Sequence, residues 1–192
     1  KAELTALSET CHKYGLYLFL DGARLGYGLA APDNDLTLPD IAALCDVFYI
    51  GGTKVGALFG EAVVIKNPEL AQDFRYLIKQ NGGMLAKGRL LGLQFDALFT
   101  DGLYQGISAH AIAMAEKLRE AFTAKGYNYL APNRTNQIFV IVPDAHLEKI
   151  AEQFEYSYDQ RIDATHSCVR FCTGWATKEE NVDELIRCVE KL

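Results

Sequence analysis

The sequence lacks any stretch that suits a membrane, and it lacks an excess of basic residues. No window of about 18 residues is apolar and free of charge, so we expect no transmembrane helix. The formal net charge is -6, which argues against a broad surface for nucleic acid or anionic lipid. No leader of basic, apolar and then small residues opens the chain. We therefore expect a cytoplasmic protein that binds neither nucleic acid nor a membrane.

The sequence also lacks a cysteine pattern that would indicate disulfide bonds or a zinc site. The five cysteines are an odd number, and Cys168 and Cys172 have no second cysteine or histidine pair at zinc-finger spacing. We expect reduced, mostly buried thiols and no metal site.

What is present is enough apolar sequence for a packed core. The 192 residues are 49% hydrophobic and 23% charged, which suits one domain or two small ones. The first residues already follow a helical pattern, with Leu4, Leu7, Cys11 and Tyr14 on one face before Gly15. This start in the middle of a helix predicts that an N-terminal part of the protein is absent. A trimmed tag or a frayed start is the alternative.

Strand and helix patterns alternate in the first half. Apolar runs predict buried strands at residues 17–20, 46–50 and 62–65, and helical patterns cover residues 38–44, 67–79 and 84–99. Such alternation is typical of an α/β domain with a mainly parallel sheet, which we place at residues 1–100.

The second half has the pattern of a small α+β domain, residues 101–192. A long helix carries Ile107, Ala111, Met114, Leu118 and Phe122 on one face and ends before residue 126. Strands are predicted at residues 137–142 and 168–172, with a helix at 143–154. A capping box formed by residues 177 and 180 predicts the start of the last helix.

Three residue types of chemical interest follow the predicted strands. Asp21 and Arg24 come after the first strand, and Lys54 comes after the second, behind a pair of glycines. The ends of parallel strands meet at one crevice, where a lysine amine, a carboxylate and a guanidinium suit pyridoxal 5′-phosphate and an amino acid. The alternative is ordinary, because acids and lysines at strand ends are often solvated and Asp-Gly is often only a turn.

Four motifs resemble one enzyme family. They are LDGARLG at residues 20–26, YIGGTK at 49–54, QNGGM at 80–84 and VRFCTGWAT at 169–177. In this order they are similar to the low-specificity threonine aldolases, of the β-eliminating-lyase group of fold-type-I pyridoxal phosphate enzymes. The resemblance runs over the whole chain. It implies an aspartate-aminotransferase-like fold, with part of the large domain followed by the small C-terminal domain.

The resemblance also implies roles for individual residues. Lys54 matches the lysine that forms a Schiff base with the cofactor, and Asp21 matches the partner of its pyridine nitrogen. Arg24 and Arg170 match arginines near the substrate carboxylate, and Thr53 precedes the cofactor lysine.

Basic residues after the glycine pair match a further feature of the family. Lys87 and Arg89 correspond to residues near the cofactor phosphate, often reached across a subunit interface. Leu85 stands where some relatives have arginine, so a helix-surface charge is the alternative for both. The family's earlier phosphate-binding loop and its ring-stacking histidine have no counterpart here. His12 is expected on the surface, and His166 is either a loop residue or close to the pocket of Arg170.

The implied reaction is cleavage of threonine or allo-threonine to glycine and an aldehyde, in a homodimer or homotetramer. Another β-eliminating lyase or an aminotransferase would need the same lysine, aspartate and arginine. A third interpretation is a catalytically incompetent fragment of such an enzyme.

Overall fold

The computed structural model describes residues 1–192 and separates them into two compact units. Unit 1 comprises Lys1–Leu29 and Asn34–Gly106, and unit 2 comprises Ala30–Asp33 and Ile107–Leu192. The boundary lies within the longest helix, α6 (Leu103–Ala124), so this helix contributes residues to both units.

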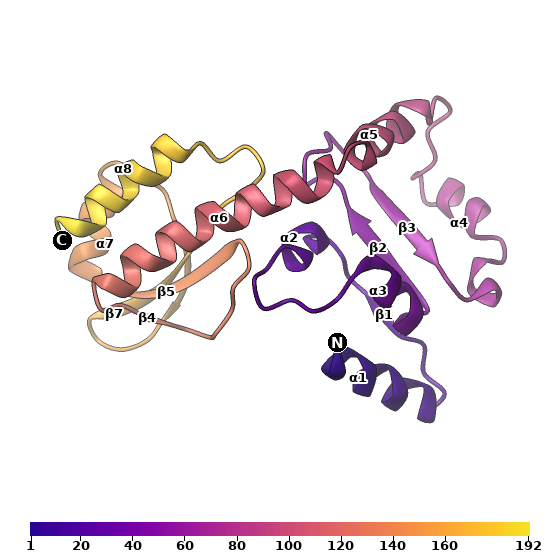
Figure 1. Ribbon diagram of the computed structural model, residues 1–192, viewed down its shortest axis with the longest axis horizontal. Coiled ribbons are helices and arrows are strands. Elements are labelled where there is room, and N and C mark those ends of the chain that lie inside the picture. The colour runs from indigo at the N-terminus through magenta and orange to yellow at the C-terminus, as the bar shows by residue number, and fades with distance from the viewer. The chain divides into compact units, whose positions relative to one another are not determined.

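Unit 1 contains a three-stranded sheet in the order β1-β2-β3 (Figure 1). Strand β1 (Phe19–Leu20) is parallel to β2 (Val47–Gly51), whereas β3 (Glu61–Ile65) is antiparallel to β2. The expectation of a mainly parallel sheet is therefore wrong for β3. The connection over residues 52–60 is shorter than the dozen or so residues that a parallel crossover needs, so the chain folds back on itself.

The core of unit 1 lies on one face of this sheet. Ile41, Cys45 and Phe48 are buried there, and Leu20 and Ile50 pack against them. The remaining elements of the unit are helices α1 (Ala2–Lys13), α2 (Leu25–Leu29), α3 (Leu38–Leu44), η1 (Pro68–Ala71), α4 (Phe74–Gln80) and α5 (Arg89–Phe99).

Three expected elements of unit 1 differ from the prediction. The strand at residues 17–20 is not fully buried, because the core packs against one face only and Phe19 on the other face is 58% exposed. The helix expected over residues 67–79 is divided into η1 and α4 by Asp73, whose φ of 58° is left-handed. The stretch expected as a helix over residues 84–99 becomes helical only at Arg89.

Unit 2 contains a four-stranded antiparallel sheet in the order β4-β5-β7-β6. Its strands are β4 (Asn128–Tyr129), β5 (Gln137–Pro143), β6 (Ser157–Arg161) and β7 (His166–Cys172). The core lies between one face of the sheet and helices α6, α7 (Asp144–Ala151) and α8 (Glu179–Glu190) (Figure 1). Strand β5 alternates accordingly: Ile138, Val140 and Val142 are fully buried, and the residues between them are half-buried.

Three smaller predictions for unit 2 and for the cysteines need correction. Helix α7 ends at Ala151, and residues 152 and 153 follow as a turn. The predicted capping box of α8 is absent, because Thr177 Oγ1 accepts a hydrogen bond from Gly174 N (2.8 Å) and Lys178 occupies the N-cap position. All five cysteines are free, as expected, but only Cys45 and Cys168 are buried.

No helix in the structure combines the length and the apolar character that crossing a bilayer requires.

Candidate active site

The turn that follows β1 is joined by its backbone to the last residue of β2. Gly51 N donates a hydrogen bond to Gly22 O at 2.9 Å. A Cβ atom on Gly22 would lie 1.7 Å from Tyr49 O, and one on Gly51 would lie 2.4 Å from Ala23 O. Both positions therefore require glycine, and this close contact fixes the turn that carries Asp21 against the strand that leads to Lys54.

The turn that carries Lys54 is held on several sides. Val55 N and Ala57 N both donate to Gly52 O, at 2.9 and 3.0 Å, and Gly52 N donates to Glu61 Oε2 at 2.6 Å. The hydroxyl of Tyr27 donates to the carbonyl of Lys54 itself. The Lys54 side chain is exposed, and its amine has no hydrogen-bond or ion-pair partner. The backbone of this turn is thus fixed, while no protein group holds the amine of Lys54.

Asp21 is an exposed carboxylate with two donors on one oxygen. Its Oδ1 accepts hydrogen bonds from Ala23 N, at 3.0 Å, and from the Tyr49 hydroxyl. The Tyr49 contact is the main cause that lowers the pKa of Asp21, with the Ala23 N–H and the positive charges of Lys54 and Arg24 adding to it. The same contact raises the pKa of Tyr49 to about 12. Asp21 is therefore an anion at neutral pH, and its Oδ2 has no partner.

Tyr104, near the start of α6, connects the start of α2 with the end of β2. Its hydroxyl accepts a hydrogen bond from Gly26 N at 3.1 Å and donates one to Gly51 O at 2.9 Å. Burial raises the pKa of Tyr104 to about 12. Neither Tyr49, Tyr104 nor Glu61 was singled out from the sequence. The sequence carries one signal for Tyr49. Successive side chains of a strand point to opposite faces, so Tyr49 faces away from the core side of Phe48 and toward the side that also bears Asp21.

The other predicted site residues of unit 1 are less closely tied to this arrangement. Arg24 lies in the turn before α2 and is half-buried, and its side chain makes no hydrogen bond. Thr53 Oγ1 donates to Gly60 O at 3.4 Å, within the Lys54 turn. Lys87 and Arg89 are exposed and form no hydrogen bond or ion pair with Asp21 or Lys54. Their assignment to a cofactor phosphate stays a prediction.

Arg170 belongs to unit 2, where it lies in β7. Its Nη1 donates to Gln137 Oε1 at 3.3 Å, and its guanidinium lies 6.0 Å from the centre of the Phe139 ring. The Nε atom is buried and has no hydrogen-bond partner. His166, four residues before it, contacts Asp163 in the preceding turn.

His12 is exposed and contacts Asp46, with 3.1 Å between Nε2 and Oδ2.

Comparison with known proteins places these features in a family. The model of the β-eliminating lyase family matches residues 1–145. A low-specificity L-threonine aldolase of a Pseudomonas species is 33% identical over 187 residues, which are 95% of this chain and 52% of that protein. The structure of Leishmania major threonine aldolase has a TM-score of 0.96 and 41% identity, and the match covers 99% of this chain and 56% of that one. A Listeria monocytogenes structure described as a putative L-allo-threonine aldolase has a TM-score of 0.75 and 25% identity, with 99% and 56% covered.

The fold is that of the fold-type-I pyridoxal phosphate enzymes, as the sequence predicts. Within this class, the chain belongs to the β-eliminating lyase family, a family of pyridoxal-phosphate-dependent lyases. The resemblance seen in the four motifs is thereby confirmed. The chain spans about half the length of the curated relatives that it matches.

Proposed function

We propose that the whole protein cleaves β-hydroxy-α-amino acids such as threonine or allo-threonine to glycine and an aldehyde, with pyridoxal phosphate as cofactor. The observation that carries this proposal is the unpartnered Lys54 amine on a fixed turn, close enough for its charge to act on ionised Asp21. The names of the similar proteins support the reaction.

The residues present fit this cofactor. Pyridoxal phosphate, when bound, supplies an aldehyde that condenses with amines and a protonated ring that withdraws electrons from the substrate Cα. Lys54 offers a primary amine without a competing partner. Asp21 remains ionised and has a free Oδ2, so it can accept a hydrogen bond from the ring N–H and keep that nitrogen protonated. Thr53, Lys87 and Arg89 are the further residues that we propose near the cofactor, the latter two at its phosphate.

In this proposal, two arginines bind the carboxylate group of the substrate. Arg24 and Arg170 bind the amino-acid carboxylate, because a guanidinium offers two parallel donors to a carboxylate. Fixing the carboxylate orients the substrate so that the bond between Cα and Cβ is the one that breaks. Assembly into a homodimer or homotetramer, the cytoplasmic location and the domain boundary near residue 100 stay predictions.

Lys54 is tested by borohydride reduction of the whole protein mixed with pyridoxal phosphate, followed by digestion and mass spectrometry. We expect one dominant pyridoxyl label on Lys54, and we expect Lys54→Ala to lose it together with threonine cleavage. Lys66→Ala, which removes another exposed lysine of unit 1, is the control and should keep both. Scattered labelling, or a dominant label elsewhere, would contradict the proposal.

A further inference from the structure

The guanidinium of Arg170 is bound on one side only. Nη1 donates to Gln137 Oε1 at 3.3 Å, whereas Nε is buried without an acceptor. A buried donor without a partner is costly, and native structures keep few of them. Nε and Nη2 form one edge of the guanidinium fork, and no protein group hydrogen-bonds to this edge, which has the geometry to bind a carboxylate.

The register of the sheet explains why Gln137 and Phe139 meet Arg170. Phe139 is paired directly with Arg170, and Gln137 is paired with Cys172, two residues further along β7. Side chains at these positions lie on the same face of the sheet, opposite the core face of Ile138 and Val169. The Phe139 ring, 6.0 Å from the guanidinium, restricts its plane, and Gln137 holds Nη1.

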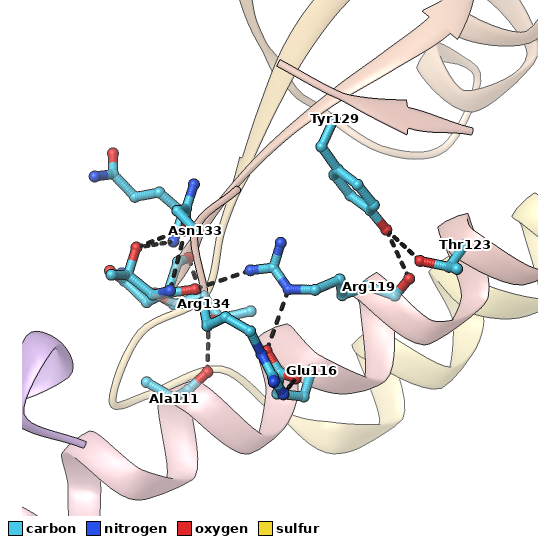
Figure 2. A network of polar contacts seen from close by, with 11 residues as sticks. Ala111, Glu116, Arg119, Thr123, Tyr129, Asn133 and Arg134 are labelled. Carbon is cyan, nitrogen blue, oxygen red and sulfur yellow. Dashed lines mark hydrogen bonds and ion pairs between the residues drawn. The ribbon is translucent and has the colours of Figure 1, made fainter. Parts of the chain in front are cut away.

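The segment before Gln137 is fastened to α6 by a network of polar contacts (Figure 2). Glu116 pairs with Arg119 and Arg134, and Arg119 Nη2 donates to Thr135 O at 3.3 Å. The Tyr129 hydroxyl donates to Arg119 O at 2.7 Å. The start of β5 therefore has little freedom to shift.

The same helix also fixes the end of β7. Asn136 Nδ2 donates to Thr173 O at 2.7 Å, and Thr173 N donates to Asn136 O at 3.0 Å. The Thr173 hydroxyl donates to Ala111 O of α6 at 2.6 Å. Gln137 and Arg170 thus stand on two strand ends that are locked to each other and to one helix.

We propose that Gln137 and Phe139 are positioning residues that present the Nε–Nη2 edge of Arg170 to the substrate carboxylate, which binds in a bidentate manner. The inference rests on the proposed function, since the carboxylate is that of the amino-acid substrate. Gln137 and Phe139 act through Arg170 and touch neither the substrate nor the cofactor.

The test is Gln137→Met in the whole protein loaded with pyridoxal phosphate. Methionine keeps the length of the side chain and removes the acceptor of Nη1. Binding of glycine and of ethylamine, which lacks a carboxylate, is followed by the cofactor absorbance. We expect glycine affinity to fall about 3- to 10-fold, the worth of one hydrogen bond, with ethylamine affinity unchanged. The KM for threonine should rise while kcat changes little.

Two comparisons separate positioning from a general loss of structure. Gln160→Met removes an exposed amide from β6 of the same sheet and should change neither affinity. In an Arg170→Lys background, Gln137→Met should have no further effect on glycine binding. The ammonium group of lysine lacks the two parallel N–H donors that Gln137 is proposed to orient.

The inference is overturned if glycine and ethylamine lose affinity equally, or if the loss persists in the Arg170→Lys background. If the unsubstituted protein cleaves threonine and labels at Lys54 while Gln137→Met keeps full glycine affinity, only this inference fails. If the unsubstituted protein neither labels at Lys54 nor cleaves threonine, the proposed function fails and this inference with it.

Discussion

At the scale of single residues, the contact between Tyr49 and Asp21 determines the charge state of the carboxylate. Tyr49→Phe removes the donor that contributes most to the lowered pKa of Asp21, while the Ala23 N–H remains. We expect the pKa of Asp21 to rise toward its ordinary value, measured by NMR of the labelled carboxyl carbon. In the whole protein, threonine turnover should fall about 2- to 10-fold, as expected for the loss of one hydrogen bond.

The matched comparisons for Tyr49 are Asp21→Asn and Tyr76→Phe. Asp21→Asn should reduce turnover more than Tyr49→Phe does, because it removes the charge itself. Tyr76 is 74% exposed, and removing its hydroxyl should leave the pKa of Asp21 unchanged. An unaltered Asp21 pKa in Tyr49→Phe would show that the hydroxyl has no influence on the carboxylate.

At the scale of elements, some helix ends carry a mark in the sequence and others do not, and the capping box predicted for α8 is absent. Helix α3 has the predicted bounds, and its N-cap Thr37 accepts a hydrogen bond from Asp40 N. The interruption of the helix expected over residues 67–79 has no such mark, because neither glycine nor proline precedes the left-handed Asp73. The direction of β3 was also not predicted from the sequence, since β3 follows β2 after a short connection and runs antiparallel to it.

The same limit applies to the candidate site. Asp21 and Lys54 are found from the sequence because each follows an apolar run, and local patterns reveal strand ends. The partners Tyr49 and Gln137 depend on how separate strands are placed beside each other. Tyr49 meets Asp21 through the pairing of β1 with β2, and Gln137 meets Arg170 through the pairing of β5 with β7. Such pairings follow from packing over long sequence separations.

The element-scale prediction concerns Tyr104, which joins α6 to the start of α2 and the end of β2. The side chain is 1% exposed, so Tyr104→Phe leaves Gly26 N without its acceptor. We expect a loss of about 1–3 kcal/mol in the free energy of unfolding, measured by denaturant unfolding followed by circular dichroism. Tyr76→Phe, which removes an exposed hydroxyl, should change this free energy little.

The effect of Tyr104 on stability should depend on pH. Its pKa in the folded protein is raised to about 12 from an ordinary value of 10.0. The neutral hydroxyl therefore stabilises the fold fully below pH 10, and this contribution is lost as the pH rises toward 12. The difference in stability between the wild type and Tyr104→Phe should shrink over that range. A difference that stays constant with pH would contradict the assignment.

At the scale of the whole molecule, unit 1 exposes apolar side chains on the face of its sheet opposite the core. Phe19 of β1 and Val63 of β3 are 58% and 46% exposed, and Tyr49 of β2 lies between them, with its ring 6.1 Å from that of Phe19. Adjacent apolar side chains on a sheet face favour association in water. We therefore expect the chain alone to self-associate in a concentration-dependent manner.

Sedimentation velocity over a range of concentrations measures this association. Phe19→Thr combined with Val63→Thr should shift the distribution toward smaller species, because both changes lower the apolar area of the face and place a β-branched residue, which suits a strand, at each position. Tyr158→Thr is the control: Tyr158 is 62% exposed in β6, where its strand neighbours Ser157, Asp159 and Gln160 are polar. A single exposed aromatic among polar residues contributes little to association, so the control should behave like the wild type. An equal shift in both variants would mean that total exposed apolar area, and not the sheet face of unit 1, governs the association.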